Sequence, residues 1–149
     1  MPKMPALNVL IDVTNEALDE AAQSMQKAAA DRNKAQEQLD MLHSYRLDYA
    51  QRLIDSAEGG VTASNYLNFR RFLTTLDDAI SQQNSIVAHS ESKLEAGRQQ
   101  WHAEKRRLSA YEALEMRQRQ HFALREARRE QRASDEIAAN LYRRSHGNH

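Results

Sequence analysis

The chain has 149 residues, of which 40% are hydrophobic and 28% are charged, and its mean hydropathy is −0.83. This composition is too polar for a compact globular core and suits a two-helix coiled coil, in which only a narrow seam is buried. A formal net charge of zero argues against bulk nucleic-acid binding, and no apolar run approaches the roughly 20 residues that span a bilayer. We therefore expect a cytosolic protein, and the absence of cysteine excludes a disulfide framework or a thiolate metal site.

The zero net charge conceals an uneven distribution of charge along the chain. Residues 1–97 carry nine Lys and Arg against fourteen Asp and Glu, whereas residues 98–149 carry twelve against seven. The chain is thus acidic over its first two thirds and basic over its last third. The basic third is suited to contact with an acidic partner.

The scarcity of helix-breaking residues predicts two long helices. No proline follows Pro5, and the only adjacent glycines are Gly59 and Gly60. We predict one helix over about residues 6–57, a turn over about 58–63 and a second helix over about 64–144. Pro5 suits a first helical turn, Gly59 is expected to adopt the left-handed conformation, and Thr62 or Ser64 caps the second helix.

Apolar residues recur along the first predicted helix in alternating steps of four and three, as the buried seam of a coiled coil requires. Eleven of the fourteen positions selected by these steps are apolar. They are Leu7, Ile11, Thr14, Leu18, Ala21, Met25, Ala28, Arg32, Ala35, Leu39, Leu42, Arg46, Tyr49 and Leu53.

A seven-residue repeat runs along the second predicted helix and comprises Leu73, Ile80, Val87, Leu94, Trp101 and Leu108. If the chain reverses near residue 61, large residues face small ones across the seam, with Trp101 opposite Ala21 and Gly97 opposite Met25. The sequence therefore predicts an all-α fold: a single domain of two long helices forming an antiparallel coiled-coil hairpin. Two polar layers, Arg32 with Ser90 and Leu39 with Gln83, are expected to be weak.

The second helix is predicted to be longer than the first, so that residues after about Met116 have no partner helix within the chain. This part carries the apolar residues Phe122, Leu124, Ile137 and Leu141. They either await a partner or are ordinary solvated helix surface, and the periodicity alone favours the second interpretation.

A second apolar and aromatic stripe runs beside the seam near the turn. On both helices its residues are spaced by four, three and four, which places them on one face of each helix. For Leu42, Tyr49 and Leu76, which also belong to the seam, a wide core is an equally good interpretation. Tyr45 and Phe72 lie beside the seam and are better explained as exposed anchors of a binding patch. The complete stripe is Gln38, Leu42, Tyr45 and Tyr49 with Phe72, Leu76, Ala79 and Gln83.

These residues lie in two segments, QLDMLHSYRLDYAQRL at residues 38–53 and GVTASNYLNFRRFLTTLDDAISQQ at residues 60–83. Both segments resemble the FliJ family, the small coiled-coil components of the bacterial flagellar type III export apparatus. The resemblance extends over about residues 7–115. It implies a hairpin like the two-helix stalk of the ATP synthase γ subunit, located in the cytoplasm and peripherally associated with the inner-membrane export apparatus.

The resemblance also implies two partners and the regions that contact them. A patch near the turn would bind the cytoplasmic domain of the export gate protein FlhA through Gln38, Leu42, Tyr45, Tyr49, Phe72, Leu76, Ala79 and Gln83, where Gln83 replaces a histidine of better-known members. The joined helix ends would enter the hexameric ring of the export ATPase and promote its assembly and activity. The residues expected there are Leu7, Ile11, Leu18, Arg106, Arg107, Tyr111, Arg117, Arg119, Phe122 and Arg125. Export chaperones are a further class of partner.

Other function classes are less well supported by the sequence. We expect no enzyme, cofactor or metal site, because a two-helix hairpin has no substrate pocket, no phosphate-binding loop is present, and the histidines outside the tail are isolated. Nucleic-acid binding by the arginine-rich third is disfavoured because Glu104, Glu112, Glu126 and Glu130 are interleaved with the basic residues. The stalk protein of a virulence type III injectisome, which is similar in build, is the main alternative.

Overall fold

The computed structural model describes residues 5–60 and 62–147 and contains two helices, α1 (Pro5–Glu58) and α2 (Ala63–His146). The predicted helical fold class is confirmed, and each helix begins and ends within about two residues of its predicted bounds. The chain divides into two compact units. We call Leu18–Ala103 the hairpin unit. The residues up to Ala17 together with those from Glu104 onward form the terminal unit.

The turn between the helices begins with two glycines that have different conformations. The Gly59 amide still donates hydrogen bonds to the carbonyl oxygens of Asp55 (3.2 Å) and Ser56 (3.1 Å), so this residue continues the last turn of α1. The left-handed residue is Gly60, with φ of 82°, and the prediction of that conformation for Gly59 is therefore wrong. The expected centre of the turn, Val61, lies outside the described residues.

The start of α2 is capped by Thr62, one of the two predicted capping residues. Its hydroxyl oxygen accepts a hydrogen bond from the Asn65 amide at 3.3 Å, and its carbonyl oxygen accepts one from the Tyr66 amide at 3.1 Å. The first bond satisfies an amide that has no backbone partner in the first helical turn, and the second is the first backbone hydrogen bond of the helix.

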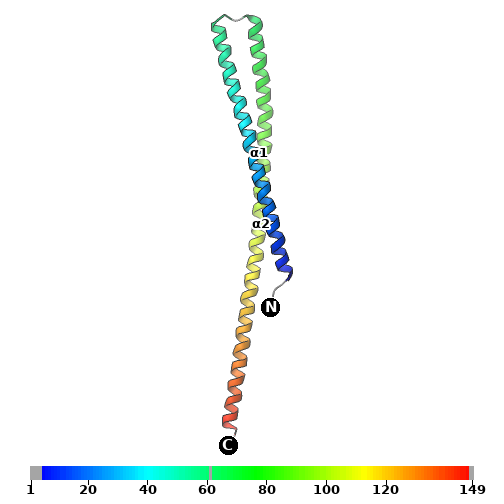
Figure 1. The fold of residues 1–149 in the computed structure, drawn as a ribbon, viewed down its shortest axis with the longest axis vertical. Helices are drawn as coiled ribbons and strands as arrows, with labels where there is room; N and C mark the ends of the chain where they lie inside the picture. The colour runs from blue at the N-terminus through cyan, green and yellow to red at the C-terminus, as the bar shows by residue number, and fades with distance from the viewer. Residues whose placement is uncertain (1–4, 61, 148–149) are drawn as a thin grey trace. The chain divides into compact units, whose positions relative to one another are not determined.

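The hairpin unit is held together by the predicted seam. A cluster of buried residues combines Ala35 and Leu39 of α1 with Ile80 and Val87 of α2, and Leu42 packs against it. The two helices of this unit lie side by side and are joined at one end by the turn (Figure 1). A Cβ atom at Gly97 would lie 3.5 Å from the Cα of Met25, which confirms the predicted opposition of these two residues.

The two polar layers of the seam differ from each other. Gln83 is buried, and its side-chain amide donates hydrogen bonds to the Ala35 carbonyl (2.9 Å) and to the side-chain oxygen of Gln38 (3.4 Å). This layer is therefore closed by hydrogen bonding, contrary to the expected weakness. At the other layer Arg32 turns outward and forms an ion pair with Glu91 at 3.4 Å.

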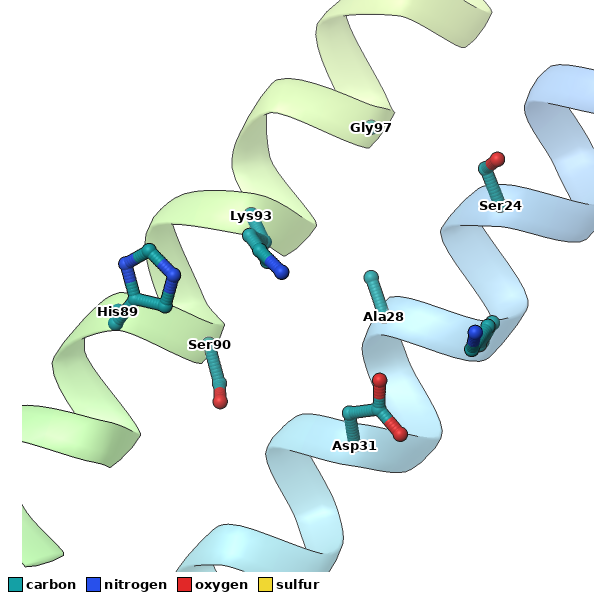
Figure 2. A pocket seen from close by; sticks show the side chains of 8 residues that line it. Ser24, Ala28, Asp31, His89, Ser90, Lys93 and Gly97 are labelled. Carbon is teal, nitrogen blue, oxygen red and sulfur yellow. The ribbon is translucent and has the colours of Figure 1, made fainter.

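An open groove lies between the helices beside this second layer (Figure 2). Its floor is made of small residues, including Ala28, Ser90 and Gly97, whose side chains do not fill the space between the backbones. Lys27, Asp31, His89 and Lys93 border it together with Ser24. The weakness expected at Ser90 thus corresponds to incomplete filling of the seam.

In the terminal unit the seam is buried only where both helices are present. Leu7 and Thr14 of α1 and Leu108 of α2 are buried, and the Thr14 hydroxyl donates a hydrogen bond to the Leu10 carbonyl at 2.7 Å. From residue 119 to residue 147 every residue is exposed except Glu126, which is half-buried. We call residues 119–146 of α2 the arm; no second helix lies beside its red end in Figure 1. Within residues 5–60 and 62–147, neither helix contains a stretch apolar enough to cross a membrane.

Candidate partner-binding surfaces

The aromatic stripe near the turn is partly a surface and partly a core. Tyr45 and Phe72 are 54% and 41% exposed. Tyr49 is half-buried and packs against Phe72, with its ring centroid 4.2 Å from that of Phe72 and 5.4 Å from that of Phe69. One side of the Phe72 ring is thus supported by Tyr49, which holds the exposed ring in place.

The heptad positions explain why these residues share one side of the hairpin unit. Gln38 directly precedes the seam residue Leu39, and Phe72 directly precedes the seam residue Leu73. Gln38 of α1 contacts Gln83 across the seam, and Phe72 of α2 contacts Tyr49 across the seam. Residues that directly precede the seam on either helix therefore lie on the same flank of the hairpin unit. Tyr45 and Ala79 occupy equivalent positions, since each is seven residues from one of these two.

Not every residue of the predicted gate patch is available to a partner. Leu76 and Gln83 are buried, and Leu42 and Ala79 are half-buried. Gln83 instead orients Gln38, because its amide donates a hydrogen bond to the Gln38 side-chain oxygen. The exposed surface of the patch therefore consists of Gln38, Tyr45 and Phe72, and any part that Leu76 and Gln83 play is as support.

An ion pair bridges the helices on the opposite flank of the hairpin unit. Arg46 Nε donates a hydrogen bond to a carboxylate oxygen of Asp77, which directly follows the seam residue Leu76. This hydrogen bond lowers the pKa of Asp77 below its usual value and raises the pKa of Arg46. Both side chains remain exposed to solvent, so the pair links the two helices without burying the surface between them.

The residues expected to contact the ATPase ring fall into two groups. Leu7 is buried, and Ile11, Leu18 and Tyr111 are half-buried in the seam, so these four hold the helices together. The second group is exposed and comprises Arg106, Arg107, Arg117, Arg119, Phe122 and Arg125.

Only some of these arginines carry uncompensated charge. Arg107 pairs with the buried carboxylate of Glu104 at 3.2 Å, and Arg119 pairs with Glu115. Arg106, Arg117 and Arg125 form no ion pair with any residue that the structure describes. Their charge is free to attract an acidic surface.

Sequence reasoning overlooked another exposed apolar surface, in the terminal unit. Val9, Leu10 and Val13 of α1 and Leu114 of α2 are all exposed. The signal was present in the sequence, because Val9 and Val13 are four residues apart and lie on one helix face beside the seam. The regular seam of Leu7, Ile11 and Thr14 accounted for apolar residues here and obscured this second line.

Among residues 5–60 and 62–147, no group of three or more His, Asp or Glu side chains could hold a metal ion. The surfaces described above display aromatic and cationic side chains along the flanks of the helices.

The chain is similar to known proteins both in sequence and in structure. The sequence profile of the family described as "Flagellar FliJ protein" matches residues 2–147. The chain is 30% identical over 138 residues to the flagellar FliJ proteins of Escherichia coli and of Salmonella typhi, covering 93% of this chain and 94% of each relative. In shape it is similar to the YscO homologue CT670 of Chlamydia trachomatis, with a TM-score of 0.72, 16% identity and coverage of 100% and 98% of the two chains.

Proposed function

Because the chain belongs to the flagellar FliJ protein family, we propose that it is a non-catalytic component of the flagellar type III export apparatus, linking the hexameric export ATPase to the export gate. It would work in the cytoplasm, peripherally associated with the inner-membrane apparatus, and export chaperones would be further partners. The two curated relatives favour this role over that of an injectisome stalk, since the likeness to the Chlamydia structure, at 16% identity, extends to the fold alone.

The observation that carries the gate contact is the exposed pair Tyr45 and Phe72 on one flank of the hairpin unit. Neighbouring exposed aromatic side chains are typical anchors of a protein interface. Tyr49 supports Phe72, and Gln83 orients the neighbouring Gln38. The cytoplasmic domain of the gate protein FlhA is the proposed occupant of this patch.

The contact with the ATPase ring is proposed for the exposed arginines of the terminal unit and the arm. Arg117 and Arg125 have no ion-pair partner among the described residues, and Phe122 lies between them in sequence. Long cationic side chains on a single helix can engage an acidic ring lining without fixing one orientation. The arm would be covered when the ring assembles around it.

The gate patch is tested by replacing Tyr45 and Phe72 together with alanine. Loss of two anchors should weaken binding to the gate's cytoplasmic domain about tenfold or more and reduce swimming, while the helical circular dichroism stays nearly unchanged. The matched control is Leu47→Ala, which removes a 70% exposed leucine elsewhere on α1. Unchanged gate affinity would exclude the patch. Loss of helicity together with binding would show that the two residues belong to a wide core.

The ring contact is tested in the full chain by reversing the charge of the two arginines that have no ion-pair partner among the described residues. The variant Arg117→Glu with Arg125→Glu should lose stimulation of ATP hydrolysis by the export ATPase but keep its affinity for the gate. Arg143 and Arg144, in the last turn of α2, provide a charge-matched control when both are changed to glutamate. Equal stimulation by both double variants and the parent chain would refute a specific contact at this part of α2.

A further inference from the structure

The groove of Figure 2 opens on the flank of the hairpin unit that carries the gate patch. Asp31 of α1 and Lys93 of α2 border it from the two helices. Asp31 is one heptad from Gln38, and Lys93 is three heptads from Phe72, so each occupies the same heptad position as a residue of the patch. The groove and the exposed surface of the patch therefore lie on one flank.

The seam residue Arg32 explains why this flank is open at the level of the groove. Its side chain turns to the opposite flank and pairs with Glu91, which stands two heptads from Asp77. Ser90, its expected neighbour across the seam, and Ala28 are too small to fill the space that it leaves. The hairpin unit thus keeps a hollow on the flank of the gate patch, where a larger seam residue would have closed it.

Exposed apolar side chains connect the groove with the gate patch. Met41 of α1 is 53% exposed and Ile86 of α2 is 50% exposed. Met41 lies one helical turn from Tyr45, and Ile86 lies two heptads from Phe72, so both belong to the same flank. At 1.5 Å per residue, the surface from Tyr45 to Ser24, which borders the groove, extends about 30 Å along the helices.

The groove end of this surface is positively charged. Lys27 and Lys93 border the groove from opposite helices, and Lys34 lies one heptad from Lys27. Asp31, on the groove lining, carries the opposing charge. None of these four side chains forms an ion pair with a residue that the structure describes. Three ammonium groups against one carboxylate leave a net positive charge that attracts an acidic side chain.

We propose that the gate contact extends from the patch into this groove, and that its occupant is a helix of the gate's cytoplasmic domain with an acidic side chain at the groove end. This inference rests on the proposed gate contact, because a partner seated on the patch reaches the groove along the same flank. A helix of about 20 residues covers the span. Its apolar side chains would cover Met41 and Ile86, and its carboxylate would lie between Lys27 and Lys93.

The charge of the groove is tested by the affinity of the full chain for the purified cytoplasmic domain of the gate protein, at low and at high salt. Lys27→Glu with Lys93→Glu should weaken binding about tenfold or more at low salt and less at high salt, because salt screens the attraction. Asp31→Asn should tighten binding, since it removes a repelling carboxylate. The charge-matched control, Arg143→Glu with Arg144→Glu in the last turn of α2, should leave the affinity unchanged.

The hollow itself is tested by Ser90→Leu. A leucine at this seam position fills the groove, so it should raise the thermal midpoint of the chain and weaken gate binding. Effects of opposite sign on stability and affinity cannot result from unfolding. Circular dichroism of each variant checks that its helices remain.

The same measurements separate the groove from the gate patch. Binding that requires the two aromatic anchors but not the two lysines would overturn the inference and leave the proposed function intact. Weaker binding by Asp31→Asn would indicate a basic occupant and would also overturn it, as would full affinity of Ser90→Leu. If the parent chain does not bind the gate domain, the proposed gate contact fails and its extension fails with it.

Discussion

The hairpin unit and the arm have the same helical backbone but opposite patterns of burial. In the hairpin unit Leu39, Ile80 and Val87 are buried in a cluster formed by both helices. In the arm the comparable residues Leu124, Ile137 and Leu141 are all exposed. The difference shows that a helical sequence pattern and a buried core are separate properties, because the core requires a second helix at the same level.

The arm is stabilised by local interactions instead. Arg129 pairs with Glu126 at 3.8 Å, and the Gln131 amide donates a hydrogen bond to Asp135 at 3.0 Å. Each such pair contributes only about 0.2–0.5 kcal/mol to helix stability. Stability of the hairpin unit should therefore depend on the seam, whereas the arm should be insensitive to loss of any one apolar side chain.

The largest expected effect comes from truncating one leucine in each region. Leu39→Ala leaves a cavity in the buried cluster and should lower the free energy of unfolding by about 2–4 kcal/mol. Leu124→Ala removes the same atoms from the exposed arm and should change it by less than about 0.5 kcal/mol. Urea denaturation followed by circular dichroism measures both values. Equal losses would mean that the arm is packed against something in solution.

The next largest effect on stability is expected from introducing a larger side chain in each region. Ala21 is buried and is expected to face Trp101 across the seam. Ala21→Phe should overpack this layer and cost about 1–3 kcal/mol in the free energy of unfolding, whereas Ala127→Phe on the exposed arm should be almost neutral. The thermal midpoints report the difference. An unchanged midpoint for Ala21→Phe would show that the register near Trp101 is incorrect.

The sequence was sufficient to predict the fold because every level of the pattern agreed. The four-three spacing of apolar residues, the absence of proline and the paired glycines all indicated one antiparallel hairpin. Even the opposition of Gly97 and Met25 followed from the position of the turn. Details that depend on the exact backbone, such as which glycine has positive φ, could not be obtained from spacing.

The candidate sites could be predicted only as stripes along helices. Tyr45 and Phe72 were identified as exposed because they lie one position beside the seam. The burial of Gln83 was not predicted, because a polar residue at a seam position fits either a splayed layer or a closed hydrogen bond. The exposed Val9, Leu10 and Val13 at the start of α1 were overlooked because the neighbouring residues Leu7 and Ile11 already fitted the seam.

A smaller effect of opposite sign is expected at the close approach of the two helices. The Cβ atom introduced by Gly97→Ala would lie 3.5 Å from the Cα and 3.7 Å from the Cβ of Met25, which are ordinary contact distances. Since alanine favours a helix over glycine, this change should raise the free energy of unfolding by about 0.5–1 kcal/mol. Chemical denaturation measures the gain. A loss of stability would mean that the helices approach more closely in solution than these distances indicate.

The smallest effect is expected from the ion pair between Arg46 and Asp77. The hydrogen bond from Arg46 lowers the pKa of Asp77 in the folded protein, whereas in the unfolded chain this carboxyl group keeps its ordinary pKa. The pair therefore stabilises the fold at pH values above the unfolded pKa, and this contribution is lost as the pH falls through the lower folded pKa. Because both side chains are exposed, the effect is small and screened by salt.

Asp77→Asn should accordingly lower the thermal midpoint slightly at neutral pH and low salt, and the difference from the parent chain should disappear in strong acid. Arg46→Gln should have the same effect, and the double variant should be no less stable than either single variant, because each change already removes the pair. The arm provides the comparison: Glu126→Gln breaks a pair within one helix and does not loosen the contact between two. If Asp77→Asn and Glu126→Gln lower the midpoint equally, the bridge across the hairpin contributes nothing beyond local helix stability.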